Sequence, residues 1–179
     1  MRKLKIEPAT AENIEEILVL DCLCFMGIWA RKAYLREIES PNSSLLLLWL
    51  TEAQSPPKAI GIGCLWSIVE EAHITLLGID PLYHRQGLGM LLLHSLLKDA
   101  RKRNLERATL EVKVTNDPAL NLYEKFGFEV AGKRKNYYTQ TGEDAFILWL
   151  NGLNKPEFEH QLDNWFEVVC DRLKPRYSI

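Results

Sequence analysis

The segment HRQGLG at residues 84–89 places two glycines and an arginine where a short apolar strand, ending at Ile79, gives way to a helical pattern. The first backbone N–H groups of a helix have no partner within it, and the helix dipole adds partial positive charge there. Glycine at 87 and 89 removes Cβ atoms that would hold a phosphate away, and Arg85 can add a full charge. A pyrophosphate fits this pattern. An ordinary strand-to-helix connection with two incidental glycines fits the spacing almost equally well.

The segment is neither of the two common nucleotide motifs. A dinucleotide fingerprint needs a third glycine and an acidic residue after a second strand, and a P-loop needs Gly-Lys-Ser/Thr. The pattern resembles instead the coenzyme A pyrophosphate loop of the GNAT superfamily of N-acetyltransferases, Gln/Arg-x-x-Gly-x-Gly/Ala. His84 departs from the usual Gln or Arg. That departure affects one side-chain contact and leaves the backbone amides unchanged.

Two further positions stand out in the segment LEVKVTNDPALNLYEKFGF, residues 110–128. Glu111 interrupts an apolar strand pattern, although alternation alone predicts a solvent-facing residue there. Tyr123 falls on the following helical pattern, where a core aromatic is the ordinary interpretation. The residues by themselves do not decide between these interpretations and a catalytic one.

The same segment is similar to the RimI-type ribosomal-protein-alanine N-acetyltransferases, which carry Leu-Glu-Val-Arg-x-Ser-Asn, Ala-Leu-Tyr and Gly-Phe in this order. The FMGIW turn at 25–29 and the NYY at 136–138 also look like this family. The resemblance implies that Glu111 is the general base, Tyr123 the general acid and Asn116 a coenzyme contact. It also implies coenzyme binding along the strand and the loop, by Leu77, Gly78, Ile79, Arg85, Gln86, Gly87, Leu88, Gly89 and Met90, and acceptor binding by Phe25, Trp29, Tyr137 and Tyr138.

The resemblance implies an enzyme that transfers acetyl from acetyl-CoA, without a metal, to the N-terminal amine of a protein, with a small-subunit ribosomal protein beginning with alanine as a candidate. A lysine, polyamine or antibiotic acceptor is the second interpretation, and it would favour a carboxylate-rich acceptor pocket. A coenzyme A-binding module without turnover is the third. His84 favours this third interpretation, and intact Glu111 and Tyr123 oppose it.

Composition limits the class of protein. The chain has 179 residues, 47% apolar and 26% charged, with a net charge of −2, which suits one globular domain and gives no electrostatic reason to expect nucleic acid or membrane binding. The basic start MRKLKIEPAT lacks an apolar run, so no signal peptide is expected. The four cysteines form no metal-ligand pattern and are expected to be reduced core thiols of a cytoplasmic protein. The oligomeric state stays open.

The order of elements predicts how these residues are positioned. Hydrophobic periodicity gives β–α–α–β–β–β–α–β–α–β–β, an α/β protein with a mixed sheet covered by helices on both faces, which is also the order of the acetyltransferase superfamily. Residues 132–144 are expected to be a loop, and its KRK run at 133–135 either attracts an acidic acceptor or is simply solvated. We expect the acetyltransferase domain to span 1–150. Residues 151–179 are expected to add an amphipathic helix that covers the domain's own apolar surface or, less simply, a partner.

Overall fold

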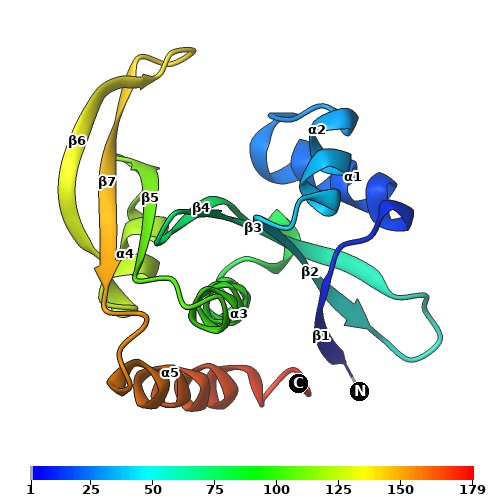
Figure 1. Ribbon diagram of the computed structural model, residues 1–179. Coiled ribbons are helices and arrows are strands. Elements are labelled where there is room, and N and C mark those ends of the chain that lie inside the picture. Colours follow the sequence, from blue (N-terminus) through cyan, green and yellow to red (C-terminus); the bar gives the residue numbers. More distant parts are fainter. Residues whose placement is uncertain (1) are drawn as a thin grey trace.

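The computed structural model describes residues 2–179 as a seven-stranded mixed sheet with helices on both faces (Figure 1). The sheet order is β1-β2-β3-β4-β5-β7-β6, so the predicted fold class and element order are confirmed. The strands are β1 Lys3–Pro8, β2 Ser43–Thr51, β3 Lys58–Ile68, β4 Glu71–Ile79, β5 Arg107–Lys113, β6 Glu129–Tyr138 and β7 Glu143–Asn151. The helices are α1 Ile14–Phe25, α2 Arg31–Glu39, α3 Leu88–Lys102, α4 Asp117–Lys125 and α5 Glu157–Leu173.

Two apolar cores lie on opposite faces of this sheet, because its central strands are buried on both sides. Leu47 and Leu48, adjacent on β2, are both fully buried but belong to different cores. Side chains of α1 and α2 fill one core, and side chains of α3, α4 and α5 fill the other. The continuous apolar run of β2 follows directly from this double burial.

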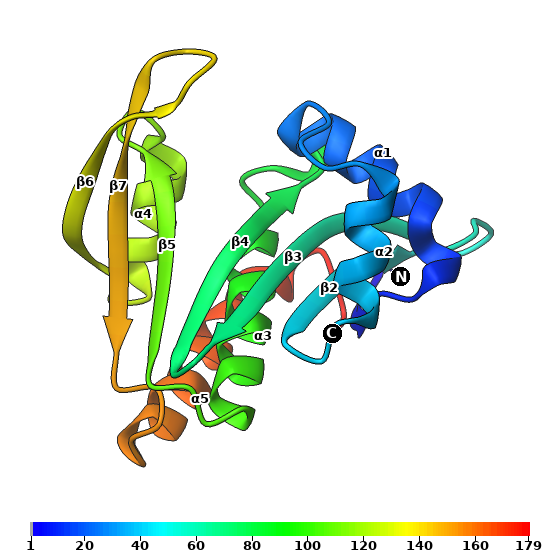
Figure 2. The same cartoon turned by 45° about the horizontal axis from the view of Figure 1, so that its top comes forward.

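β4 and β5 are parallel but remain paired only at their first residues. The pairing runs from Glu71↔Arg107 to His73↔Thr109, and beyond it the two strands separate. Figure 2 shows them meeting at one end and diverging toward the other. On its other side, β4 pairs with β3, and the register of that pairing shifts between residues 74 and 76 of β4. Such a shift indicates a β-bulge, and it lies just beyond the point where β4 and β5 separate. The separation leaves an open strand edge inside the sheet.

The expected loop at 132–144 is wrong in extent, because most of it is strand. β6 continues to Tyr138 and pairs with β7 through Arg134↔Ala145 and Tyr138↔Glu143, so only residues 139–142 form the turn. β6 is an edge strand with almost all of its side chains exposed. An edge strand without a buried face carries no apolar alternation, which is why the pattern did not reveal it.

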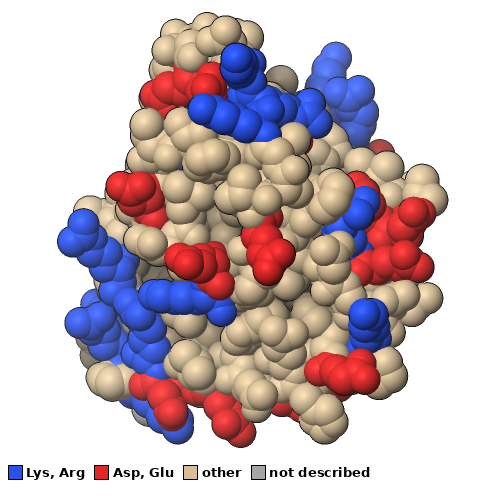
Figure 3. Space-filling model, turned by 90° about the vertical axis from the view of Figure 1, so that its left-hand side faces the viewer, with Lys and Arg blue, Asp and Glu red and all other residues tan. Residues whose placement is uncertain are grey.

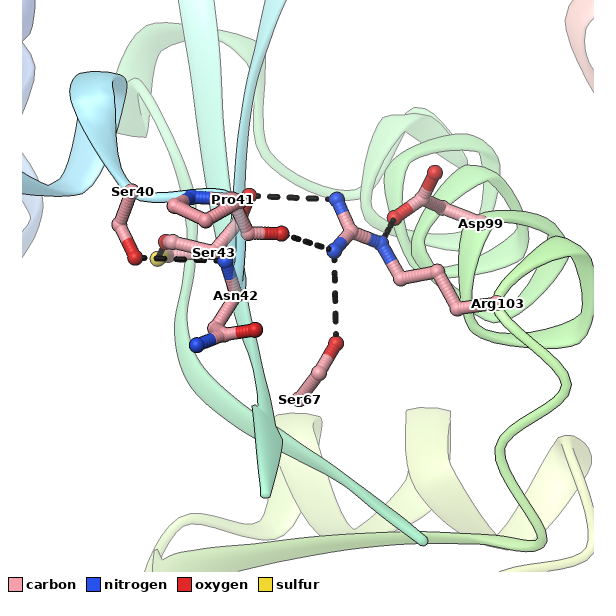
Figure 4. Close-up of polar contacts among 8 residues, drawn as sticks. Ser40, Pro41, Asn42, Ser43, Ser67, Asp99 and Arg103 are labelled. Atoms are coloured by element: carbon pink, nitrogen blue, oxygen red, sulfur yellow. Dashed lines mark hydrogen bonds and ion pairs between the residues drawn. The ribbon is translucent and has the colours of Figure 1, made fainter. Parts of the chain in front are cut away.

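Arg103, at the C-terminal end of α3, forms hydrogen bonds with the start of β2 and the residues before it (Figure 4). Its guanidinium donates to the carbonyl oxygens of Pro41 at 2.8 Å and Ser43 at 3.2 Å, while its Nε donates to Asp99 at 2.7 Å. These bonds fix the direction of α3. The position of the loop that precedes its N-terminal end depends on that direction.

The C-terminal residues form α5 and a short return to the sheet edge. Phe158, Leu162, Val169 and Leu173 are buried in the same core as α3, and the buried His94 on α3 contacts the Leu162 carbonyl oxygen at 3.0 Å. Figure 1 shows α5 beside α3 and the two termini close together. No helix among residues 2–179 is long and apolar enough to cross a membrane.

The four cysteines are free thiols, but the expectation that all lie in the core is wrong. Cys64 is buried, Cys24 and Cys170 are partly exposed, and Cys22 is exposed. Cys22 lies on the exposed side of α1, a helix of 12 residues in which apolar side chains occur on more than one face, so the sequence pattern does not show which side is covered.

Candidate active site

The loop between β4 and α3 presents a row of unpaired backbone amides. Arg85 and Gly87 have positive φ values of 60° and 92°, so the chain alternates between left-handed and other conformations before α3 begins at Leu88. Within residues 2–179, the N–H groups of residues 85–89 have no backbone acceptor. Such a succession of N–H groups at a helix start forms a concave anion site. Met90, expected to contribute, donates its N–H to the Gly87 carbonyl oxygen at 3.1 Å instead.

The two glycines of this loop have different structural roles. Gly89 has open space around it, because a Cβ there would meet only Leu122 at 3.5 Å. A Cβ on Gly87 would lie 2.9 Å from Cδ and 3.2 Å from Nε of Arg172, a residue of α5. Sequence reasoning gave both glycines the task of admitting a phosphate. The space beside Gly87 is occupied by an arginine from the C-terminal helix.

His84 takes part in the backbone structure of the loop. Its Nε2 lies 2.8 Å from the carbonyl oxygen of Ile79, the last residue of β4. The imidazole therefore links the loop to the end of the strand. The histidine departure from the family pattern thus has a positioning role that the sequence did not indicate.

Glu111 lies on the separating part of β5 with both carboxylate oxygens engaged. Oε2 is 2.7 Å from His73 Nε2, and Oε1 is 3.5 Å from Arg134 NH2. Its side chain is 11% exposed. The hydrogen bond from His73 is the main cause that lowers the pKa of Glu111, with the charges of His73 and Arg134 adding to it against the opposing effect of burial. Glu111 is therefore an ionised, oriented carboxylate at the mouth of the gap.

His73 is the residue that sequence reasoning missed. Its imidazole faces Glu111 from the last paired position of β4. Its ring also stands edge-on to Trp66 of β3, with centroids 6.0 Å apart. Only the register between β4 and β5 brings these residues together. Nothing in the local sequence around His73 specifies that register.

Asn116 caps the start of α4, and Tyr123 lies in its last turn. The Tyr123 ring is 7% exposed and meets Phe128 edge-on at 5.5 Å. Burial, and to a smaller degree the nearby Tyr138, raises the pKa of Tyr123 well above its ordinary value. The Asn116 side chain accepts the N–H of Ala119 at 3.3 Å and caps the helix, which leaves its amide NH₂ to meet a ligand.

Aromatic side chains flank Glu111 from two sides. Trp29, held by the bond from its N–H to Asp21 Oδ2, stacks on Trp66 at 5.9 Å, and Trp66 in turn contacts His73. On the other side, Tyr137 and Tyr138 of β6 meet edge-on at 5.1 Å. Both tyrosines are close enough for the charge of Glu111 to raise their pKa values, although burial is the larger cause. Trp66 and His73 thus connect Trp29 to one side of the carboxylate, and Tyr137 and Tyr138 lie near it on the β6 side.

The other residues of the 25–29 turn, which include the expected acceptor contact Phe25, differ in their surroundings. Phe25 packs against Gly78 of β4, where a Cβ would meet its Cζ at 2.6 Å. Met26 and Ile28 are 86% and 58% exposed, so they do not tuck into the core. Gly78 is therefore required by the close approach of α1 to the coenzyme-side end of β4. Leu77 and Ile79, on either side of Gly78, are partly buried against the α3 core.

The KRK run contributes little free positive charge. Lys133 pairs with Asp144 at 3.0 Å, and Arg134 is shared between Glu111 and the face of Tyr137. Figure 3 shows small groups of both signs over the face that carries β6 and β7. Within residues 2–179, no group of three His, Cys, Asp or Glu side chains is arranged to hold a metal ion.

Comparison with known proteins places this geometry among acetyltransferases. Residues 14–128 match the acetyltransferase (GNAT) family. A Bacillus subtilis (strain 168) protein is 32% identical over 149 residues, which cover 83% of this chain and 95% of that protein. That protein is provisionally named a ribosomal protein bS18-alanine N-acetyltransferase. The crystal structure of the ribosomal-protein-S18-alanine N-acetyltransferase from Escherichia coli is 29% identical with a TM-score of 0.71, covering 83% of this chain and 93% of that one.

A third comparison concerns the fold alone. The NatC complex bound to Gag peptide and CoA contains a chain that is 20% identical, with a TM-score of 0.73 and coverage of 83% of this chain and 98% of that one. This match shows that the two chains share a fold.

Proposed function

The chain belongs to the acetyltransferase (GNAT) family, and we propose that within it the protein acetylates the N-terminal α-amine of a protein, with acetyl-CoA as the donor. The named relatives make the N-terminal alanine of ribosomal protein bS18 the first acceptor to test. The observation that carries the proposal is the placement of Glu111. It lies where β4 and β5 separate, between the open strand edge and the aromatic side chains.

The described residues fit the coenzyme. The N–H groups of residues 85–89 match the oxygens of a diphosphate, and the open edge of β4 at 77–79 suits the amides of an extended pantetheine chain. The amide of Asn116, on the other side of the gap, is a further contact. When bound, acetyl-CoA supplies a reactive thioester. The chain's own residues then orient the acceptor amine and manage its proton.

Glu111 accepts the proton of the acceptor amine in this proposal, directly or through a water. His73 and Arg134 hold the carboxylate in one orientation, so little reorganisation is needed when the amine arrives. The same contacts lower its pKa, which makes it a weak base. A weak base is adequate only for an amine that is already partly neutral.

That requirement favours an α-amine over a lysine. An α-amino group has a pKa of about 7.7–8.0 and a lysine side chain about 10.4, a difference that costs the lysine roughly 3–4 kcal/mol more to deprotonate at neutral pH. The aromatic side chains Trp29, Tyr137 and Tyr138 are themselves neutral. The carboxylates beside them already have partners: Glu37 accepts from Trp66 and Ser43, and Glu143 pairs with Lys113. An extended peptide N-terminus is the acceptor that suits both observations.

Tyr123 acts in this proposal as a hydrogen-bond donor to the departing sulfur. Its raised pKa keeps the phenol neutral, and full proton transfer to a thiolate, whose conjugate acid has a pKa near 8.5, is uphill. A neutral, buried phenol can still stabilise the developing negative charge by donating a hydrogen bond.

The proposal is tested by acetyl transfer to a panel of acceptors. The panel contains an Ala-starting peptide, a Met-starting peptide, their N-terminally blocked forms with an internal lysine, and spermidine. We expect transfer to the free Ala peptide and none to the blocked peptides or spermidine. Transfer only to lysine or spermidine would overturn the N-terminal assignment, and coenzyme binding without transfer to any acceptor would favour a non-catalytic role.

A further inference from the structure

The C-terminal helix reaches the proposed phosphate loop directly. The Cγ and Cδ atoms of Arg172 lie 3.1 Å and 2.9 Å from the position that a Cβ of residue 87 would take. Gly87 has a φ of 92°, so it is the left-handed residue immediately before α3. The aliphatic part of Arg172 therefore lies against the backbone whose N–H groups are unpaired. Its Nε, 3.2 Å from the same Cβ position, places the exposed guanidinium beside that row.

A second residue of the same segment contacts the loop from another direction. Tyr177 is 5% exposed, and its hydroxyl donates a hydrogen bond to Oε1 of Gln86. The segment around it is attached to the sheet edge, because Leu4 N donates to Ser178 O at 2.8 Å and Ser178 N donates to Arg2 O at 2.9 Å. The extension is thus fixed at both α3 and β1. Its contact with the loop does not depend on Arg172 alone.

The charges around the loop are arranged for an anion. Lys174, two residues beyond Arg172, is paired with Asp171 at 2.8 Å, whereas the Arg172 guanidinium has no ion-pair partner among residues 2–179. Arg85 in the loop also has no carboxylate partner in the described part of the chain. An unpaired, planar guanidinium beside free amides matches the oxygens of a diphosphate.

We propose that Arg172 is a coenzyme-binding residue that contacts the diphosphate of coenzyme A, so that residues 157–179 form part of the coenzyme site. The inference rests on the proposed function, since it assumes that the loop binds the coenzyme. Tyr177 is a positioning residue, because it acts through Gln86. The extension therefore has a task at the site in addition to covering the apolar face of α3.

The same geometry allows a second interpretation, in which the Arg172 side chain blocks access of the coenzyme to the loop. If Arg172 had to leave the loop before the coenzyme could enter, removing its side chain would strengthen binding. If it contacts the diphosphate, removing it weakens binding. The sign of one affinity change distinguishes these two interpretations.

The test compares Arg172→Gln with Lys174→Gln in the full-length protein. Both variants remove one positive charge from the same segment, and Lys174 lies about 200° around the helix from Arg172, on the opposite face. The dissociation constant of coenzyme A is measured by calorimetry at two salt concentrations, with dephospho-coenzyme A, which lacks only the 3′-phosphate, as a second probe.

We expect Arg172→Gln to weaken coenzyme A binding by about 3- to 10-fold and to flatten its salt dependence, while Lys174→Gln stays within about 2-fold of the unchanged protein. The loss should be equal for both probes. A loss confined to coenzyme A would overturn the diphosphate assignment, and unchanged or tighter binding would overturn the proposal. Failure of the unchanged protein to bind coenzyme A would instead overturn the proposed function.

Discussion

In the proposed function, the two ends of β4 serve different steps and use different chemical groups. At the His73 end, side chains from neighbouring strands contact one another. The imidazole and Arg134 each bind one carboxylate oxygen of Glu111, and the His73 ring packs edge-on against Trp66. At the Ile79 end, the functional groups are backbone N–H groups of residues 85–89. They are supported from behind by the C-terminal segment through Arg172 and Tyr177.

This difference predicts that the groups responsible for turnover and the groups responsible for coenzyme affinity lie at opposite ends of β4. A proton acceptor must be a titratable side chain whose orientation is fixed by its neighbours. A phosphate is bound as well by amides, which need only the right backbone conformation. Substitutions at the His73 end should therefore change turnover, and substitutions at the Ile79 end should change coenzyme affinity. Each of the following predictions either sharpens that division or breaks it.

The largest effect is expected at Glu111. Glu111→Gln keeps the shape of the side chain and removes the proton acceptor, so kcat should fall about 100- to 1,000-fold. The dissociation constant of coenzyme A should not change. Steady-state kinetics and calorimetry on the same preparation measure both, with Glu129→Gln on the exposed edge strand as the control. Loss of coenzyme affinity comparable to the loss of turnover would break the division.

The next effect is expected at Gly87. Gly87→Ala forces a Cβ into a left-handed position and against Arg172, and such backbone strain costs about 1–3 kcal/mol. The loop should shift, and coenzyme A should bind about 10-fold more weakly. Gly142→Ala is the matched control, because Gly142 has a φ of 71° but nothing within 4 Å of its added Cβ. Equal losses of affinity in both variants would show that strain alone, without displacement of Arg172, accounts for the change.

His73 should give an intermediate effect with a pH signature. His73→Ala removes the hydrogen bond that lowers the pKa of Glu111, so that pKa should rise and the acidic limb of the kcat profile should move to higher pH. Turnover at neutral pH should fall about 10-fold through lost orientation. His73→Gln, which keeps a donor, should recover part of it. A lower kcat with an unmoved acidic limb would reduce His73 to a packing role.

The smallest effect is expected at Tyr123. Tyr123→Phe removes one hydrogen-bond donor from the departing sulfur and leaves the ring packed on Phe128, so kcat should fall about 5-fold with coenzyme affinity and thermal stability nearly unchanged. Measuring kcat and the coenzyme dissociation constant on the same variant shows whether Tyr123 acts in turnover or in coenzyme binding. Losses of similar size in both would place Tyr123 in coenzyme binding.

What could be predicted from the sequence follows the same division. The proposed phosphate loop is local, so the six consecutive residues HRQGLG, together with their resemblance to the superfamily pattern, were enough to make it a candidate. The order of elements was also predicted, because helices and buried strands carry distinct apolar periods. The contact of His73 with Glu111 depends on the register of two strands separated by α3, and β6 beyond residue 132 has no buried face. Neither leaves a local signal.

The role of Gly87 shows a third kind of limit. Glycine was expected on chemical grounds, for a phosphate, and the structure gives an additional steric reason that comes from Arg172, far along the chain. Residues 151–179 were expected to contain an amphipathic helix, and its apolar positions could not indicate that the last turn of α5 meets a loop of the proposed site. A contact between the end of a helix and a distant loop does not affect the hydrophobic periodicity of either segment, so the sequence pattern does not reveal it.

Hydrogen exchange on adding coenzyme A tests the division of the site most directly. The amides of residues 85–89 have no acceptor in the described chain, so they should exchange rapidly in the free protein and slowly once the coenzyme is bound. The account predicts protection of residues 85–89 and of the segment around Arg172 and Tyr177, with β6 residues 133–138 unchanged until an acceptor peptide is added. Coenzyme-induced protection at β6 without protection at 85–89 would contradict it.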